Sequence, residues 1–339
     1  MVRVALDVMG GDRAPEAPVR GAVAAVRADD DLEVQLIGEP GAIEDALGSL
    51  SLSDATRSRL RVIEAPDRIG PEEPPAMAVR RKPESSIVEG LRMTARDEAD
   101  AFVSAGPTGA VMAGSLLELE ALPGVDRPAI GAVFPTVETP TLVLDVGANV
   151  NCRPSHLHQF AHLGLIYARE MLGRSSPRIG LLNVGEEAKK GDEVVCAAHD
   201  LLSADGALNF VGNVEGNQII GGRCDVLVCD GFVGNALLKF FESMAEFVVG
   251  WLEGHGESAE EAPAGLFELL SVLDYAEYGG APLLGVNGVS IVCHGSSSPR
   301  AIQNALGFAA RSVRSGMLDH LAREMERTAS RTDGEAAPR

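Results

Sequence analysis

The sequence predicts an α/β fold built around a largely parallel sheet, and three observations carry this prediction. Short β-branched or aliphatic runs alternate with longer helical patterns along the whole chain, as repeated βα units require. Three of the helical patterns begin at a proline, where a first helical turn tolerates a missing N–H: Pro15, Pro154 and Pro299. Polar or glycine-rich turns follow the apolar runs. The 339 residues correspond to about two domains or one large unit.

The predicted elements follow from these patterns in chain order. The runs that predict strands are Val2–Leu6, Glu33–Ile37, Ala101–Val103, Thr141–Leu144, Ile179–Leu182, Val226–Val228 and Val289–Val292. The patterns that predict helices are Pro15–Arg27, Glu84–Glu98, Thr108–Leu122, Pro154–Leu172, Asp192–Leu202 and Pro299–Arg327. Residues 65–75 hold four prolines and a glycine, which indicates a loop at the rim of a site.

Residues 237–277 differ from the rest and predict an inserted helical hairpin. Helical spacing relates the apolar residues of a first stripe, Leu237, Phe241, Met244, Val248 and Trp251, and a second stripe runs from Leu266 to Leu273. So much apolar surface indicates a dimer contact, and the more specific alternative is contact with a membrane. We therefore expect a core of residues 1–236 and 278–329 and a frayed tail at 330–339.

Composition excludes several classes of protein. The 49 acidic residues outnumber the 29 basic ones and give a net charge of −20, which disfavours nucleic acid as a partner. Hydrophobic residues at 45% are typical of a soluble globular protein, and no apolar run approaches the roughly 18 residues of a membrane span. Five cysteines without C-x-x-C pairing predict reduced thiols in a cytoplasmic protein.

Seven of the strand-end turns gather candidate ligand-binding groups. They are residues 7–12, 104–108, 145–151, 183–191, 213–216, 230–235 and 294–298. In a parallel sheet such loops meet at the carboxyl edge, and glycine N–H groups beside helix N-termini favour phosphate. A nucleotide fingerprint is missing, because there is no G-x-G-x-x-G and the order of Lys190, Gly191 and Asp192 departs from that of a P-loop.

Several single residues suggest chemistry and also permit a structural role. Lysine occurs only four times, so the adjacent Lys189 and Lys190 at a strand exit favour a ligand charge over a solvated loop. His294 ends a strand and is as consistent with a structural role as with ligand contact. His158 and His162 have the spacing of zinc ligands, but Gln159 replaces the base of H-E-x-x-H, so no metal is expected.

The strand-end loops resemble, nearly end to end, the bacterial phosphate acyltransferases of phospholipid synthesis, which make acyl-phosphate from acyl-(acyl-carrier-protein) and phosphate. The matching blocks are residues 5–12, 80–82, 104–106, 144–149, 185–191, 212–216, 229–235, 277–288 and 294–297. Pro107 and Asn151 depart from the family pattern, where Asn and Asp are expected, so neither side chain is a candidate for catalysis.

The resemblance implies a three-layer α/β/α sandwich like that of isocitrate and isopropylmalate dehydrogenases, and a homodimer without cofactor. It also implies weak peripheral attachment at the inner face of the cell membrane, with hand-over of product to a membrane glycerol-3-phosphate acyltransferase. Lys190, Asn235 and His294 are then the catalytic candidates. The candidates for binding phosphate or substrate are Asp7, Gly10, Gly11, Asp12, Ser104, Gly106, Thr108, Asn149, Asp230, Gly231 and Ser296. Docking of the acidic carrier protein falls to Arg80, Arg81 and Lys82.

The residues agree with direct attack of phosphate on the thioester, with Lys190 holding charge. Because phosphate is already a nucleophile, no activated Ser or Cys is needed, and Cys152 is interpreted as structural. One rival is an oxidative decarboxylase related by fold, which would need NAD and a divalent metal. The other is an acyl-carrier-protein or membrane scaffold, which leaves the glycine-rich loops unexplained.

Overall fold

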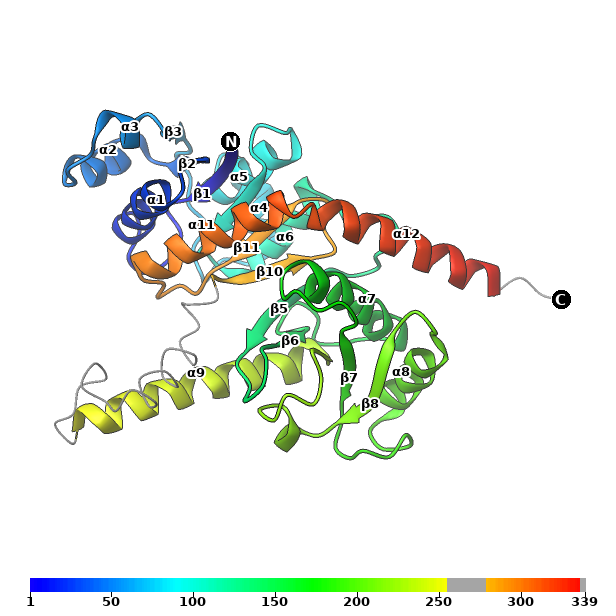
Figure 1. Ribbon diagram of the computed structural model, residues 1–339. Helices are drawn as coiled ribbons and strands as arrows, with labels where there is room; N and C mark the ends of the chain where they lie inside the picture. The colour runs from blue at the N-terminus through cyan, green and yellow to red at the C-terminus, as the bar shows by residue number, and fades with distance from the viewer. Residues whose placement is uncertain (255–278, 336–339) are drawn as a thin grey trace. The chain divides into compact units, whose positions relative to one another are not determined.

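The computed structural model describes residues 1–254 and 279–335 (Figure 1). The chain divides into two compact units. Unit 1 comprises Met1–Gly124 and Tyr278–Arg323, and unit 2 comprises Val125–Glu277 and Glu324–Arg339. Each unit has its own sheet and its own helices.

The sheet of unit 1 places the ends of three strands side by side. Its strands are β1 (Val2–Asp7), β2 (Leu32–Gly38), β3 (Leu60–Glu64), β4 (Ala101–Ser104), β10 (Ala281–Leu284) and β11 (Val289–Val292), in the order β3-β2-β1-β4-β11-β10. All neighbours are parallel except β10 and β11. Asp7 pairs with Ser104 and Ser104 with Val292, so β1, β4 and β11 end in line.

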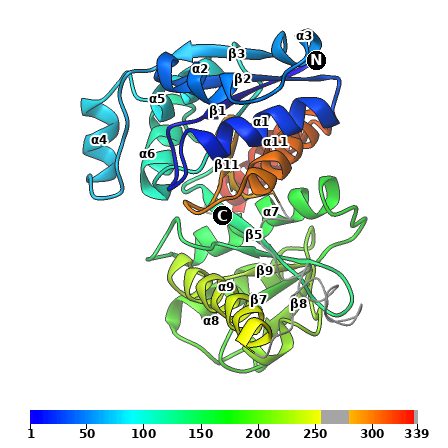
Figure 2. The ribbon, with the colours of Figure 1, turned by 90° about the vertical axis from the view of Figure 1, so that its left-hand side faces the viewer.

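Helices cover both faces of this sheet (Figure 2). On one face, α1 (Glu16–Ala28) packs on α11 (Pro299–Arg314), which lies across β1 and β4. A Cβ on Gly21 would lie 2.6 Å from a side-chain atom of Ile302, so these two helices approach closely. On the other face, α5 (Ser86–Ala95) contacts the same strands beside α6 (Thr108–Glu118). Three short helices precede α5: α2 (Pro40–Gly48), α3 (Asp54–Arg57) and α4 (Pro75–Arg81).

The sheet of unit 2 repeats the parallel arrangement. Its strands are β5 (Ala129–Phe134), β6 (Thr141–Leu144), β7 (Arg178–Leu182), β8 (Asn209–Val214) and β9 (Val226–Val228), in the order β5-β6-β9-β7-β8. Only β5 runs antiparallel to its neighbour β6. The main helices are α7 (Pro154–Glu170), α8 (Glu193–Ala204) and α9 (Gly231–Gly254), with a 3-10 turn at Gly216–Gln218. α7 covers β6 and β9 and packs on α8.

The predicted α/β fold with largely parallel sheets is confirmed, and all seven predicted strands are present. The prediction of one helix over Pro299–Arg327 is wrong. The chain forms α11 and then α12 (Met317–Glu335), because Gly316 adopts a φ of +67° that ends the first helix in a left-handed turn. Sequence patterns also missed β3, β5, β8 and β10, and the short helices α2, α3 and α4.

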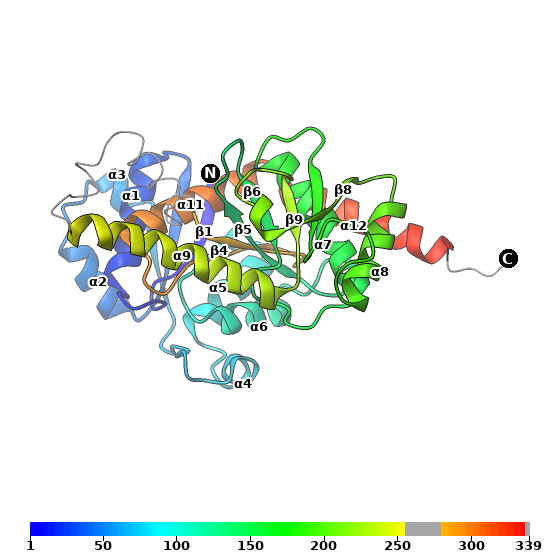
Figure 3. The ribbon, with the colours of Figure 1, turned by 90° about the horizontal axis from the view of Figure 1, so that it is seen from below.

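The first apolar stripe of residues 237–277 lies on the long helix α9 (Figure 3). Its side chains differ in exposure. Phe241 packs on Phe134 of β5, with ring centroids 5.1 Å apart, whereas Met244 and Trp251 are exposed together with Phe240 and Phe247. The second stripe lies outside the described residues. The hairpin, the domain bounds drawn around it and the fraying of residues 330–339 therefore stay predictions. Within the described ranges, no helix is long and apolar enough to cross a membrane.

Candidate functional site

In unit 1, three predicted binding loops follow the aligned ends of β1, β4 and β11. The first strand ends on Asp7, whose carboxylate is buried and accepts hydrogen bonds from the Ser104 hydroxyl at 2.7 Å and the Met9 N–H at 3.0 Å. The Ser104 hydroxyl in turn accepts the Gly106 N–H at 2.9 Å. Burial raises the pKa of Asp7, and the Ser104 hydrogen bond opposes part of that shift. Asp7 and Ser104 therefore fix the loops rather than face solvent.

Backbone contacts join these loops further. Asp12 N–H donates to the Gly295 carbonyl at 2.8 Å, while Gly11 adopts a φ of +92° that disfavours any side chain. A Cβ on Gly10 would lie 2.5 Å from the Gly106 nitrogen, so only glycine permits this approach. The loops after β1, β4 and β11 thus interlock, which confirms that the sheet brings these predicted residues together.

The outer rim of the same loops carries exposed polar groups. Asp12, Thr108, His294 and Ser296 are all exposed, and His294 Nδ1 lies 2.7 Å from Ser296 Oγ. α6 begins at Thr108, and Ser298 caps α11 by accepting the Ala301 N–H at 3.2 Å. Two helix N-termini therefore lie next to the rim, and their partial positive charge favours an anion there.

In unit 2, Asp145 holds the loop that follows β6. Its buried carboxylate accepts five hydrogen bonds, all from N–H groups, between 2.6 and 3.2 Å: Ile130, Gly147 and Ala148 N–H on Oδ1, and Asn149 N–H and Nδ2 on Oδ2. Burial raises the pKa of Asp145, and these donors oppose the shift. The Asn149 amide also donates to the Pro128 carbonyl at 2.7 Å, so this predicted binding side chain is engaged structurally.

The loop after β9 packs directly on the Asp145 loop. Gly231 N–H donates to the Asn149 carbonyl at 2.8 Å, and a Cβ on Gly234 would lie 1.9 Å from the Asp145 carbonyl oxygen. Asp230 accepts the Phe232 and Val233 N–H groups at 2.9 and 3.0 Å and so caps α9. Asn235, one turn into α9, is exposed beside Gly147. Of the predicted residues here, Asn235 is the one that presents its side chain outward.

Lys190 lies on the third loop of unit 2, after β7. Its carbonyl accepts the Asn183 amide at 2.8 Å, and its N–H donates to the Glu187 carbonyl at 3.0 Å. Gly191 follows with a φ of +95° and leads into α8, which Asp192 caps by accepting the Val195 N–H at 2.8 Å. The backbone is thus fixed while the side chain is exposed. In the part of the chain that is described, the ammonium makes no ion pair with Glu186 or Glu187.

The basic cluster Arg80–Lys82 ends α4 at the far end of the predicted rim loop. Arg80 and Arg81 are exposed, whereas Lys82 is tied down by Glu73 and the Arg68 carbonyl, both at 2.7 Å. The two arginines are therefore the free part of the predicted docking surface, and Lys82 organises the loop.

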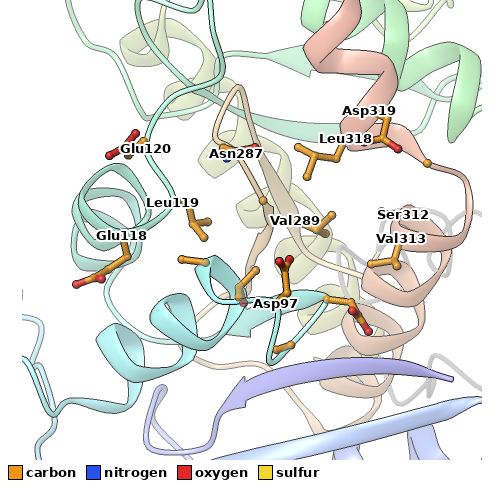
Figure 4. A pocket seen from close by; sticks show the side chains of 16 residues that line it. Asp97, Glu118, Leu119, Glu120, Asn287, Val289, Ser312, Val313, Leu318 and Asp319 are labelled. Carbon is orange, nitrogen blue, oxygen red and sulfur yellow. The ribbon is translucent and has the colours of Figure 1, made fainter.

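A cavity in unit 1 lies away from these loops (Figure 4). It is lined by residues that precede β4 and begin β11, so it lies at the amino edge of the sheet. Five carboxylates line it: Asp97, Asp100, Glu118, Glu120 and Asp319. Asp100 and Glu118 are paired with Arg3 and Arg92, but none of the described residues that line the cavity is basic, so its charge disfavours phosphate.

Two further sequence interpretations concern residues of unit 2. Cys152 is half-buried, and burial raises the pKa of its thiol to about 12, so it is a poor nucleophile.

Asp145 was missed as a functional candidate. Its position after a strand and before a glycine-rich loop is the same signal that identified Asp7, and it could have been found that way.

Solved structures with this α/β arrangement include phosphotransacetylases. The chain is similar to the phosphotransacetylase of Streptococcus pyogenes, with a TM-score of 0.64, 15% identity, and coverage of 93% of this chain and 94% of that one. The EutD phosphotransacetylase of Staphylococcus aureus gives a TM-score of 0.62 at 14% identity over 92% and 94% of the two chains. A 4-hydroxythreonine-4-phosphate dehydrogenase of Klebsiella pneumoniae gives 0.51 at 14% identity over 92% and 98%. At these identities the likeness shows the fold class alone.

Sequence comparison then places the chain in one family. The family model described as "Fatty acid synthesis protein" matches residues 2–320, and the chain belongs to this family. Its relatives include the phosphate acyltransferase of Heliobacterium modesticaldum, 48% identical over 94% of this chain and 96% of the relative. The phosphate acyltransferase of Salinibacter ruber is 45% identical over 97% and 98%. The resemblance seen in the strand-end loops is thereby confirmed, and the protein is an acyltransferase.

Proposed function

We propose that the protein transfers a fatty acyl group from acyl-(acyl-carrier-protein) to inorganic phosphate and releases acyl-phosphate for phospholipid synthesis. The single observation that carries the proposal is the pairing of two features. Within unit 2, the loop after β7 leads into the N-terminus of α8, and on the same loop Lys190 extends an exposed ammonium from a fixed backbone. Both features favour a small, multiply charged anion.

The reaction needs no covalent intermediate on the protein. A phosphate oxygen attacks the thioester carbonyl carbon and forms a tetrahedral oxyanion. The C–S bond then breaks, the electron pair leaves with the carrier thiolate, and the acyl group stays on phosphate as a mixed anhydride. Lys190 offsets the charge that phosphate and the oxyanion bring together, and Asn235 of the same unit is a secondary donor. His294, on unit 1, stays a separate candidate.

Charge complementarity supports the carrier protein as acyl donor. The chain carries a net charge of −20, so an acidic partner needs a local basic surface. Arg80 and Arg81 are exposed at the end of α4 and supply one. The proposal assigns them to recognition and not to the chemical step.

The exposed face of α9 supports self-association. Phe240, Met244, Phe247 and Trp251 recur at helical spacing and are 42–64% exposed. We propose that this face forms a homodimer and adds a weak membrane contact that helps hand the product to a membrane acyltransferase. Contact with anionic lipid is weaker than the dimer contact, because basic residues attract such lipid and residues 237–277 contain only one, Lys239.

The experiment that tests the proposed reaction incubates the purified chain with acyl-(acyl-carrier-protein) and labelled phosphate, and measures the label that is extracted as acyl-phosphate, with a sample without the chain as control. We expect labelled acyl-phosphate to form without NAD, with release of free carrier thiol in equal amount. Turnover that requires NAD would support the dehydrogenase rival. Carrier binding without either product would support a scaffold, and each result would overturn the proposed reaction.

A further inference from the structure

A cluster of metal-ligating side chains lies in unit 2, outside the loops described above. His158 and His162 lie one turn apart on α7, and Asp205 ends α8, which packs against α7 (Figure 1). One carboxylate oxygen, Asp205 Oδ2, lies 2.9 Å from His158 Nε2 and 2.8 Å from His162 Nε2. The three ligand atoms all fall within 4.8 Å of one another. Two imidazoles and a carboxylate thus converge on one point.

The cluster is rigid and mostly sealed from water. The side chain of His162 is 0% exposed and that of Asp205 is 6% exposed, while His158 is open at 16%. The second oxygen of Asp205 accepts the Ala207 N–H at 3.0 Å, which fixes the carboxylate so that Oδ2 faces the histidines. The cluster is therefore most exposed to solvent at His158.

A fourth residue orients His162 in the manner of an outer-shell partner. His162 Nδ1 lies 3.0 Å from Glu324 Oε1, on α12. With Nδ1 donating to Glu324, the remaining lone pair of the neutral ring is on Nε2, which faces Asp205. Two acceptors cannot lie 2.8 Å apart without a proton or a cation between them. A carboxylate behind a histidine ligand is the usual second shell of a metal site.

We propose that His158 Nε2, His162 Nε2 and Asp205 Oδ2 bind one Zn²⁺ ion, with Glu324 as the outer partner and water as fourth ligand. Nitrogen and oxygen ligands at about 2.0–2.2 Å around a tetrahedral ion lie roughly 3.3 Å apart. The two N–O distances must therefore lengthen by about half an ångström, and the two histidine nitrogens, which lie within 4.8 Å of one another, must adjust to the same separation. The ion ties α7 to α8 and, through Glu324, to α12.

The sequence predicts neither a structural nor a catalytic metal, because Gln159 replaces the base of H-E-x-x-H and no cysteines are paired. Gln159 lacks the base that a hydrolytic H-E-x-x-H site needs, and its side chain accepts the Asp126 N–H at 3.0 Å, away from the cluster. The identity of residue 159 excludes peptidase chemistry, but it does not prevent the two histidines from binding a metal ion. The ligand that completes the set, Asp205, comes from a separate element and has no fixed spacing from them. The site is therefore structural and is distinct from the acyl-transfer loops.

The test uses the untagged full-length chain after treatment with a chelator. Zn²⁺ is titrated against a chromophoric competitor, and Co²⁺ is added separately to record visible absorption. We expect one equivalent of Zn²⁺, a Co²⁺ spectrum of a four-coordinate ion, and a Zn²⁺-dependent rise in melting temperature. Mg²⁺ should give none of these.

Variants separate the cluster from other histidines. His158→Ala and Asp205→Asn should each weaken Zn²⁺ binding about 100-fold, and Glu324→Gln should weaken it about 10-fold. His199→Gln removes an imidazole of α8 that lies outside the cluster. This variant should bind Zn²⁺ with the affinity of the wild type. Failure of the wild-type chain to bind one Zn²⁺ would overturn the proposal without reference to any variant. So would unchanged affinity in both His158→Ala and Asp205→Asn.

Discussion

Asp7 in unit 1 and Asp145 in unit 2 lie at equivalent positions at the ends of strands, but they differ in the hydrogen bonds that they accept. Each is a buried aspartate at the end of a parallel strand, and each begins a glycine-rich loop. Asp7 accepts from the hydroxyls of Ser104 and Ser86, which can reverse their direction, and from the backbone N–H groups of Met9 and Gly10. Asp145 accepts from five N–H groups, none of which can become an acceptor. Position 7 therefore tolerates a neutral side chain, whereas position 145 requires a side chain with two acceptor oxygens.

The difference shows that the partners of a buried carboxylate decide its role more than its position does. In unit 1 the loops interlock through backbone contacts such as Asp12 to Gly295, so Asp7 is one support among several. In unit 2, Asp145 organises the chain around Asn149 and Gly231 almost alone. The exposed groups differ as well, since unit 1 offers His294 and hydroxyls, and unit 2 offers Lys190 and Asn235.

The largest effect on stability is expected from Asp145→Asn. The new NH₂ group would face N–H donors, so at least one buried donor loses its acceptor at a cost of about 2–3 kcal/mol. Thermal melting should show a fall of roughly 5–10 °C. A variant that melts like the wild type would show that the five contacts do not hold this loop.

The exposed face of α9 gives the next prediction. Phe240→Asp combined with Phe247→Asp should weaken dimerisation about 100-fold, because two large apolar side chains are replaced by charges at one interface. Sedimentation velocity at micromolar concentration measures the change. Glu242→Gln is the control, because it alters the same helix without removing apolar surface. An unchanged sedimentation coefficient would contradict the assignment of this face.

A smaller change is expected from the basic end of α4 in unit 1. Reversing charge with Arg80→Glu and Arg81→Glu should raise the KM for acyl-(acyl-carrier-protein) about 10-fold and flatten its dependence on salt. The kcat should stay the same, because neither residue acts in the chemical step. If KM at low salt does not move, carrier docking lies elsewhere.

Asp7→Asn should have the smallest effect, within about 1 kcal/mol at neutral pH, because an amide can donate to Ser104 and still accept from Met9. Because burial raises the folded-state pKa of Asp7, its contribution to stability is complete below the unfolded pKa of about 3.9 and declines as pH rises through the folded-state pKa.

Melting temperatures measured from about pH 4 to pH 8 test the direction of this effect. The wild type should lose stability relative to Asp7→Asn as pH rises through that window. If Asp7→Asn lowers the melting temperature more than Asp145→Asn does, Asp7 and not Asp145 is the more important support of its loop.

Much of the fold could be predicted from the sequence because buried parallel strands are short apolar runs. Two of the missed strands have mixed burial, because β8 carries Asn209 and Gly212, and β3 has one buried side chain among half-buried and exposed ones. The other two, β5 and β10, are mostly buried and belong to antiparallel pairs. α11 and α12 were joined because the amphipathic pattern continues through Gly316, and only the positive φ of that glycine ends the first helix.

The positions of Asp7 and Lys190 at strand ends could be predicted from the sequence, and their roles stay predictions. Contacts that depend on tertiary structure could not be predicted. No spacing rule connects Asp205 of α8 or Glu324 of α12 to the histidines of α7. The engagement of Asn149 with Asp145 and Pro128, which makes it a support rather than a free ligand, also follows only from the folded loop.

The most direct test of the central claim compares Lys190→Met with Lys189→Met. Both residues are exposed on the same loop, but Lys190 adjoins Gly191 and has its carbonyl fixed by Asn183. Turnover is measured at saturating phosphate and acyl-(acyl-carrier-protein), with folding checked by thermal melting. We predict a fall of about 10² or more for Lys190→Met and near-normal turnover for Lys189→Met. Near-normal turnover of Lys190→Met would contradict the account.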